Sequence, residues 1–485
     1  MRAPCSTFLE GGIIFQLATS SPTPTQPVDK RQLGALSAVN SILSSAATGV
    51  ASDAAVASSI FNDLISAIEA VAPTATPTST PQATSIVSSI IAPSPSQGSF
   101  FEDVVELIAN DFVPANFGNS LSAFVNTIAQ IGPNSQTNIN LRSPAETMYP
   151  KKSSADAPYS LTEAQLRQVI YIPPSFTHGS KTPVILVPGT GNTGYETFSA
   201  NYIPLLTDVS YADPVWLNIP GQLLGDAQVN AEYVAYAINY ISGISNNRNV
   251  SVISWSQGGL ITQWALKYWP STRNVTSDFI PFSPDFHGTE NAYILCPYFP
   301  DLPCDPSIIQ QEYNSNFVTR LRQNDGDSAY VPTTTVYPSL DEVVQPQSGT
   351  GASAFLNDAR NVGVTNNEVQ VVCNGQPAGS FYDHAGTLYN PIGYALAVDA
   401  LQNPGPGQPS RAGADTACQQ VAAQGLSLEQ VLETEGALAV AGFFVLEYEP
   451  KMFDEPALMS YATSDGKRRS EFSTWVTNLR HGVRS

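Results

Sequence analysis

Charged residues are scarce in this sequence. They make up 13% of its 485 residues, and basic ones are the rarer kind: 21 Lys and Arg against 41 Asp and Glu, a formal net charge of −20. Such a chain repels phosphate backbones and anionic headgroups, so we expect no nucleic-acid partner. Hydrophobic residues make up 42%, which is typical of a folded globular protein rather than of a disordered chain.

Cysteine is also rare, with five residues, too few for a disulfide scaffold in a chain of this length. No Cys-x-x-Cys motif or Cys/His cluster occurs, so we expect neither a metal site nor a cofactor. Two structural disulfides, Cys296–Cys304 and Cys373–Cys418, are the favoured interpretation if the protein is exported, and free buried thiols are the alternative. No run approaches the roughly 20 apolar residues that a membrane-spanning helix needs.

Composition divides the chain into six parts: a leader or propeptide (1–31), a helical segment (32–72), an extended linker rich in Ser, Thr and Pro (73–99), a second helical segment (100–135), a large α/β domain (150–465) and a basic C-terminal tail (466–485). The dibasic pair Lys30-Arg31 is a candidate processing site. Asn249 and Asn274 begin N-glycosylation sequons. These features favour a secreted protein.

The large domain alternates strand and helix patterns. Continuous apolar runs at 183–188 and 249–255 have the length of strands buried on both faces, and helical patterns at 226–242 and 260–269 follow them. Alternation at this spacing predicts an α/β fold with a mostly parallel, doubly wound sheet, flanking helices and an N-terminal helical extension.

Ser256 lies where the second apolar run meets its helix, in Ser254-Trp-Ser-Gln-Gly258. A serine at a tight strand-to-helix turn is the nucleophile elbow of α/β hydrolases, whose usual motif is Gly-x-Ser-x-Gly. Here Ser254 replaces the first glycine. The pentapeptide alone does not distinguish a nucleophile from a serine in an ordinary surface turn. The strand before it and the helix after it favour a nucleophile.

A serine nucleophile needs a base, and only four histidines exist: His178, His287, His384 and His481. His384 follows Ser256 on a late loop, where this fold carries its base. The acid lies between them in chain order, and two candidates remain. Asp341, which follows the β-branched run 331–337, is the better candidate. Asp285, which follows the strand-like run 278–282, is the alternative.

The oxyanion of an acyl-transfer reaction needs fixed donors, usually the amide after the nucleophile and one from an early loop. Gln257 provides the first. The second is expected in Pro188-Gly-Thr-Gly-Asn192, which includes Thr190. The Gly-x-Gly-x-x-Gly spacing of 189–194 also permits a dinucleotide-binding loop, but no acidic strand end follows about 20 residues later.

Together these motifs resemble the fungal lipases of the Candida antarctica lipase B type. The segments that match in order are 187–191, 255–258, 284–285, 341–346 and 383–386, within about 158–465. The resemblance implies an α/β-hydrolase fold, a triad of Ser256, Asp341 and His384, and an oxyanion hole from Thr190 and Gln257. It also implies that Trp255, Asp285 and Gln311 line the substrate pocket.

The resemblance has departures. Two of the family's disulfides have no cysteines here, whereas Cys373–Cys418 matches a family bridge and Cys296–Cys304 is an addition in a lid-like segment. The apolar helix expected over 436–446, with a capping box at Ser427 and Gln430, matches one that borders the family's pocket mouth. Ordinary core packing is the alternative role for this helix.

The sequence thus predicts a secreted serine hydrolase of carboxylic esters, a triacylglycerol lipase whose partners are ester or lipid substrates and the lipid–water interface. A small-ester or polyester esterase and acyltransferase without lipid preference is the first alternative. A non-catalytic surface protein is the second. Because every candidate chemical residue follows position 183, we expect a chain without residues 1–133 to fold and stay active.

Overall fold

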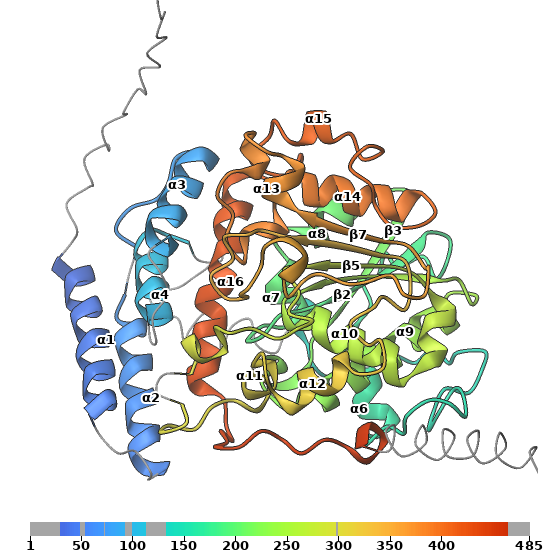
Figure 1. The fold of residues 1–485 in the computed structure, drawn as a ribbon, viewed down its shortest axis with the longest axis horizontal. Helices are drawn as coiled ribbons and strands as arrows, with labels where there is room; N and C mark the ends of the chain where they lie inside the picture. The colour runs from blue at the N-terminus through green and yellow to red at the C-terminus, as the bar shows by residue number, and fades with distance from the viewer. Residues whose placement is uncertain are drawn as a thin grey trace, which may run out of the picture.

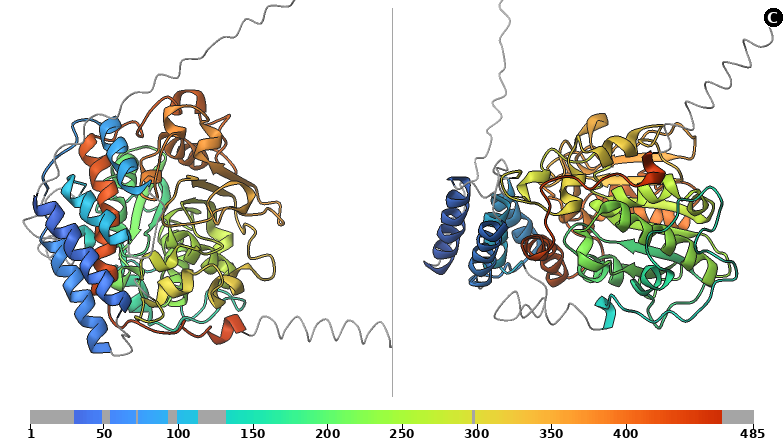
Figure 2. Two further views of the ribbon diagram at one scale, coloured as in Figure 1. Left: turned by 60° about the vertical axis from the view of Figure 1, so that its left-hand side comes forward. Right: turned by 90° about the horizontal axis from the view of Figure 1, so that it is seen from below.

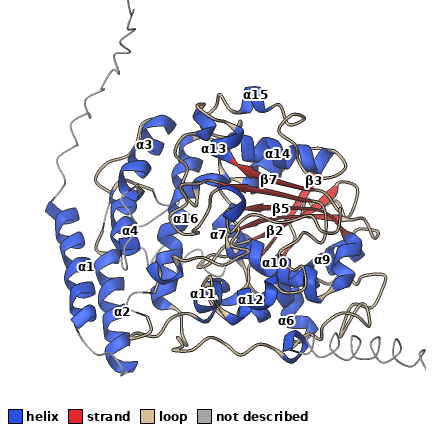
Figure 3. Ribbon diagram, viewed as in Figure 1, coloured by secondary structure: helices blue, strands red, loops and turns tan. Residues whose placement is uncertain are grey.

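The computed structural model describes residues 30–48, 54–71, 73–92, 99–112, 132–296 and 299–463. A seven-stranded sheet forms its centre, with helices on both faces (Figures 1 and 3). The strand order is β1-β3-β2-β4-β5-β6-β7, and only β1 runs antiparallel to its neighbour. The strands are β1 (Ile170–Tyr171), β2 (Thr182–Val187), β3 (Ala212–Leu217), β4 (Val250–Trp255), β5 (Thr276–Phe282), β6 (Thr333–Tyr337) and β7 (Val364–Glu368).

The helices of the large domain flank this sheet. They are α6 (Glu163–Gln168), α7 (Gly194–Phe198), α8 (Tyr202–Leu206), α9 (Ala227–Ile244), α10 (Gln257–Tyr268), α11 (Pro306–Gln311), α12 (Asn316–Arg322), α13 (Val369–Val372), α14 (Pro391–Gln402), α15 (Ala414–Ala417) and α16 (Leu428–Glu447). The predicted α/β-hydrolase architecture is confirmed. The predicted capping box at Ser427 and Gln430 also forms, at the start of α16.

The apolar run of β2 divides between two cores. Val184 and Leu186 point into a core that includes α14 and α16, whereas Ile185 and Val187 point into a core with α9 and α10. Because successive side chains of a strand alternate between faces, a strand covered on both sides must be apolar throughout. The chain passes from β2 out to β3 and returns to β4 on the other side of β2. Ligands of open parallel sheets bind at such a switch point, beyond the carboxyl ends of the strands.

Four N-terminal helices pack beside the large domain: α1 (Lys30–Thr48), α2 (Ala54–Glu69), α3 (Thr80–Ile91) and α4 (Ser99–Ala109). Helices α2, α3 and α4 contact α16, which lies between them and the rest of the domain (Figure 2). A Cβ atom on Gly442 of α16 would lie 3.0 Å from the Phe100 ring and 3.1 Å from Val104 Cγ2, so α4 and α16 approach closely.

The prediction of an extended linker over 73–99 is wrong, because α3 occupies its middle. Ser79 caps the helix by accepting the amide N–H of Gln82, and Pro81 stands in the first turn, where its missing N–H costs nothing. Val87 and Ile90 are buried on one face. The proline-rich composition therefore marks the start of a helix rather than a flexible connection.

Other predicted segments fall partly outside the described residues. The leader over 1–31 and the basic tail over 466–485 lie there, except for Lys30 and Arg31 at the start of α1. The helical segment 100–135 is helical through Ala109 and has a short 3₁₀ turn at Gly132–Asn134, while 113–131 is not described.

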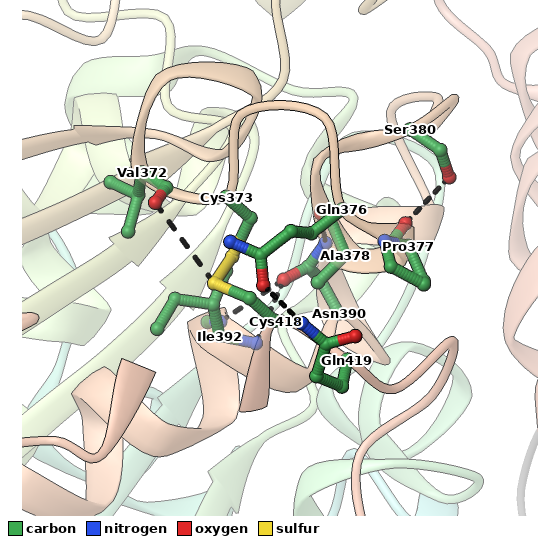
Figure 4. Close-up of a disulfide and its surroundings, with 11 residues drawn as sticks. Val372, Cys373, Gln376, Pro377, Ala378, Ser380, Asn390, Ile392, Cys418 and Gln419 are labelled. Atoms are coloured by element: carbon green, nitrogen blue, oxygen red, sulfur yellow. Dashed lines mark hydrogen bonds between the residues drawn. A yellow bond between two sulfur atoms is a disulfide. The ribbon is translucent and has the colours of Figure 1, made fainter. Parts of the chain in front are cut away.

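Both predicted disulfides are formed, with Cα atoms 5.5 Å apart in Cys296–Cys304 and 5.2 Å apart in Cys373–Cys418. Figure 4 shows the second, which joins the end of α13 to the end of α15. Beside it, Asn390 donates a hydrogen bond to Ala378 O at 2.9 Å. None of the described helices is both long and apolar enough to cross a membrane.

Candidate active site

Ser256 sits at the carboxyl end of the central strand β4 in a backbone conformation that few residues other than glycine adopt. Its φ is 54° and its ψ −132°. Its amide donates to Phe282 O at the end of β5, at 2.9 Å. This is the strained strand-to-helix turn that gives a nucleophile elbow its shape.

Two glycines allow this turn to pack. A Cβ atom on Gly258 would lie 2.4 Å from the carbonyl oxygen of Pro188, and one on Gly259 would lie 2.6 Å from Pro284 Cβ. Both positions therefore require glycine. Ser254, which replaces the first glycine of the usual motif, is a buried residue of β4, so the strand accommodates this departure.

His384 and Asp341 form a buried pair. The Nδ1 atom of His384 lies 2.8 Å and 3.0 Å from the two carboxylate oxygens of Asp341. Oδ1 of that carboxylate also accepts the amide N–H groups of Val343 and Val344, at 3.0 and 2.8 Å. Because an ionised carboxylate only accepts, Nδ1 carries the proton and Nε2 keeps its lone pair.

The imidazole loop and the serine turn are joined directly. Trp255 Nε1 donates to His384 O at 3.0 Å, and the centres of the two rings are 4.9 Å apart. Thr387 Oγ1 donates to the same carbonyl at 2.9 Å. Ser256 is 3% exposed and His384 2%, so both lie in an almost closed site.

Thr190 and Gln311 lie beside the residue that follows the serine. Gln257 Nε2 donates to Thr190 Oγ1 at 2.9 Å, and that hydroxyl donates to Gln311 Oε1 at 3.0 Å. A Cβ atom on Gly189 would lie 3.0 Å from Ser256 Cβ, so the Thr190 loop passes directly over the serine. Gln257 is the first residue of α10, so its N–H has no acceptor within that helix.

Asp285 is close to this group but does not contact the imidazole by a hydrogen bond. Among the described residues neither of its carboxylate oxygens has a hydrogen-bond partner. Burial raises the pKa of Asp285 to about 7, while His384 lowers it and Asp341 raises it. Of the two candidate acids, Asp341 is the one that binds His384.

Three further carboxyl groups near the imidazole were not singled out from the sequence. Glu342 accepts the amide N–H of His384 at 2.9 Å, and Asp383 accepts that of Gly386 at 2.8 Å. Burial raises the pKa of Glu342, Asp383 and Glu435. Repulsion by Asp383 raises the pKa of Glu342 and Glu435 further, whereas the hydrogen bond with Glu435 lowers the pKa of Asp383. Glu342 and Asp383 could have been found as neighbours of the motif residues, but Glu435 reaches the cluster from α16.

The remaining candidates are the other histidines, the two sequon asparagines and the possible metal ligands. His178 precedes β2 in the chain, and burial lowers the pKa of His287 to about 4. His481 lies outside the described residues. Asn249 and Asn274 are exposed just before β4 and β5, at the edge of the sheet opposite Ser256. In the described part, the one group of possible metal ligands is Cys296, Cys304 and Asp305. The sulfurs of its two cysteines are bonded to each other in a disulfide.

The chain is similar in sequence and in structure to known lipases. No family model matches the chain. Lipase B of Pseudozyma antarctica is 36% identical over 284 residues, which are 58% of this chain and 79% of that protein. The crystal structure of Aspergillus fumigatus lipase B is 45% identical, with a TM-score of 0.75, and the match covers 87% of this chain and 99% of that chain.

An α/β-hydrolase sheet with a serine at the strained turn after its central strand, together with these relatives, defines an enzyme that hydrolyses carboxylic esters. The chain belongs to the lipase B family. The structural match covers more of the chain than residues 150–465 can supply, so it includes part of the N-terminal region.

Proposed function

We propose that this protein is a secreted triacylglycerol lipase that works through an acyl-enzyme, with Ser256 as nucleophile, His384 as base and Asp341 as acid. The observation that carries the proposal is the His384 imidazole, bound through Nδ1 to Asp341 beside the turn of Ser256. This tautomer leaves Nε2 free to take a proton.

In the proposed first half-reaction, Ser256 Oγ attacks the carbonyl carbon of the ester while His384 Nε2 takes the hydroxyl proton. The imidazolium is stabilised by the Asp341 carboxylate, which stays ionised. When the tetrahedral intermediate collapses, His384 gives the proton to the departing alcohol and the acyl group remains on Ser256. Water then enters, and the same proton transfers release the fatty acid.

The negative charge of the intermediate needs donors that are already in place. We assign this role to the backbone N–H groups of Thr190 and Gln257 and to the Thr190 hydroxyl. The Thr190 loop passes over Ser256 and the Gln257 amide is at the start of α10, so these groups surround the place where the oxyanion forms.

Two observations bear on the substrate. Helix α16 lies against the Thr190 loop: a Cβ atom on Gly191 would meet Ala441, and Asn192 donates to Ala437 O at 3.2 Å. An apolar helix at this position supports a long acyl chain. The low exposure of Ser256 and His384 instead favours the second candidate, an esterase acting on small esters.

Export is supported by the two disulfides, which persist in oxidising compartments, and by the exposure of both sequon residues, Asn249 and Asn274.

The nucleophile is tested by labelling with a fluorophosphonate, followed by mass spectrometry of the modified peptide. We expect the label on Ser256, and Ser256→Ala should lose both label and turnover, since removal of a nucleophile costs on the order of 10⁶-fold elsewhere. Ser254→Ala, a buried serine two residues away on β4, is the matched control and should keep both. Residual turnover above a few per cent in Ser256→Ala would exclude Ser256.

The substrate class is tested by comparing rates on triolein, tributyrin and p-nitrophenyl butyrate. Turnover of emulsified triolein supports a lipase. Activity confined to the two short esters would assign the protein to small-ester hydrolysis.

A further inference from the structure

A continuous chain of side-chain hydrogen bonds crosses the oxyanion region from α9 to α11. Asn230 Nδ2 donates to Gln257 Oε1 at 3.2 Å, and Gln257 Nε2 donates to Thr190 Oγ1 at 2.9 Å. The hydroxyl of Thr190 then donates to Gln311 Oε1 at 3.0 Å. All four side chains are buried, so water does not compete for these bonds.

Main-chain carbonyls at both ends determine the direction of every bond in this chain. Asn230 Nδ2 also donates to Leu223 O at 2.9 Å, and Gln311 Nε2 donates to Ser307 O at 3.0 Å. A carbonyl oxygen can only accept, so Asn230 must turn its amide nitrogen toward Leu223 and Gln257. Gln311 must in turn present its oxygen to Thr190.

The Gln257 side chain passes this direction on. Its oxygen faces the Asn230 amide nitrogen, so its own nitrogen faces Thr190. A hydroxyl has a single hydrogen. Because Gln257 occupies the acceptor side of Thr190 Oγ1, the hydrogen must point away from Gln257, toward Gln311 or toward a ligand.

We propose that Asn230 is a positioning residue that keeps the Thr190 hydroxyl a hydrogen-bond donor toward the reacting ester. If Gln257 turned its amide over, its oxygen would capture the Thr190 hydrogen, and the oxyanion would lose this donor. Asn230 prevents that turn because the flipped amide would put two N–H donors face to face. The inference rests on the proposed function, since it assumes that an oxyanion forms beside Thr190.

Gln311 makes the donor selective for the transition state. At rest its neutral amide oxygen holds the Thr190 hydrogen, and an ester carbonyl is a similar neutral acceptor that gains little from replacing it. An oxyanion is a much stronger acceptor and takes the hydrogen over. The hydroxyl therefore contributes mainly once charge has developed, which raises kcat rather than lowering KM.

The test is a double-mutant cycle between Asn230→Asp and Thr190→Val. An aspartate at 230 accepts from Gln257 and so favours the flipped amide. With Thr190 present, we expect Asn230→Asp to lower kcat on p-nitrophenyl butyrate by about 10- to 100-fold, approaching the loss of one oxyanion donor, with little change in KM. In the Thr190→Val background the same change should cost less than about twofold, because no hydroxyl is left to position.

Two further variants keep the test decisive. Asn239→Asp makes the same change at a buried position of the same helix, where the side chain donates to Ser271 Oγ at 2.9 Å, and its effect on kcat should be equal in both backgrounds. If Asn230→Asp does not fold, Asn230→Leu replaces it, because it removes the donor that fixes the Gln257 amide and adds no charge. Its loss should likewise vanish with Thr190→Val.

An equal loss of kcat in both backgrounds would overturn the proposal, since a purely structural role for Asn230 does not depend on the Thr190 hydroxyl. No loss with Thr190 present would also overturn it. Failure of the proposed function looks different: the unmodified protein would then take no fluorophosphonate label and hydrolyse no ester.

Discussion

Replacing Asp341 by Asn tests the proposed triad with little change of shape. Oδ1 of Asp341 accepts the amide N–H groups of Val343 and Val344, so an asparagine will place its oxygen there. Its amide nitrogen then takes the place of Oδ2, 2.8 Å from His384 Nδ1. A donor at this point requires Nδ1 to accept, so the ring proton moves to Nε2, which can no longer take the proton of Ser256. We expect kcat to fall by about 10⁴-fold, which corresponds to about 5.4 kcal/mol of barrier.

The assay is kcat on p-nitrophenyl butyrate, with Asp285→Asn as the matched control. The carboxylate of Asp285 has no hydrogen-bond partner among the described residues, so its replacement by an amide breaks no described bond. We therefore expect measurable turnover and mainly altered substrate preference. Circular dichroism and the thermal midpoint establish that both variants are folded. The reverse ranking, with Asp285→Asn nearly inactive and Asp341→Asn active, would refute the assignment of the acid.

Three other outcomes are expected. Burial raises the pKa of Asp285 to about 7 from about 4 in the unfolded chain, so the folded state loses stability as pH rises through this interval; the thermal midpoint of Asp285→Asn should fall less between pH 5 and pH 8 than that of the unmodified protein. Replacing Cys373 and Cys418 by Ala opens a 45-residue loop and should cost about 4 kcal/mol in urea unfolding, against about 2.5 kcal/mol for the eight-residue loop of the other disulfide. A chain that begins at residue 132 should aggregate on size-exclusion chromatography because it uncovers α16, and a monomeric, active product would contradict this packing argument.

The sequence was most informative where chemistry is local. Three features single out Ser256 as the candidate nucleophile: a buried strand, a strained turn and two glycines. They lie within ten residues, and the structure contains each of them at its predicted place. The sequence favoured Asp341 over Asp285 without excluding Asp285, because both follow a strand and precede His384. It depends on which loop reaches Nδ1, a distance that no pattern along the chain contains.

Asn230 shows the same limit more sharply. It precedes Gln257 by 27 positions, on a different helix, and nothing in the surrounding helical pattern separates it from an ordinary buried amide. Its proposed role comes from the direction of its hydrogen bonds, which depends on Leu223 O. Only a folded backbone brings that carbonyl to it.

The packing of the N-terminal helices bears on the predicted tolerance of a truncation, which the local helical pattern does not determine. Apolar residues surround the middle of α16, and a helix that is apolar all round must be covered on every side. The sheet side can cover one face only; α2, α3 and α4 cover the other, with Phe100 and Val104 against Gly442. Removal of 1–133 would also take away Pro133, whose carbonyl oxygen accepts from Trp216 Nε1 at 2.7 Å and from Asn218 Nδ2 at 2.8 Å. Because α16 also lies against the Thr190 loop, the packing of the N-terminal helices and the geometry of the proposed oxyanion hole depend on the same helix.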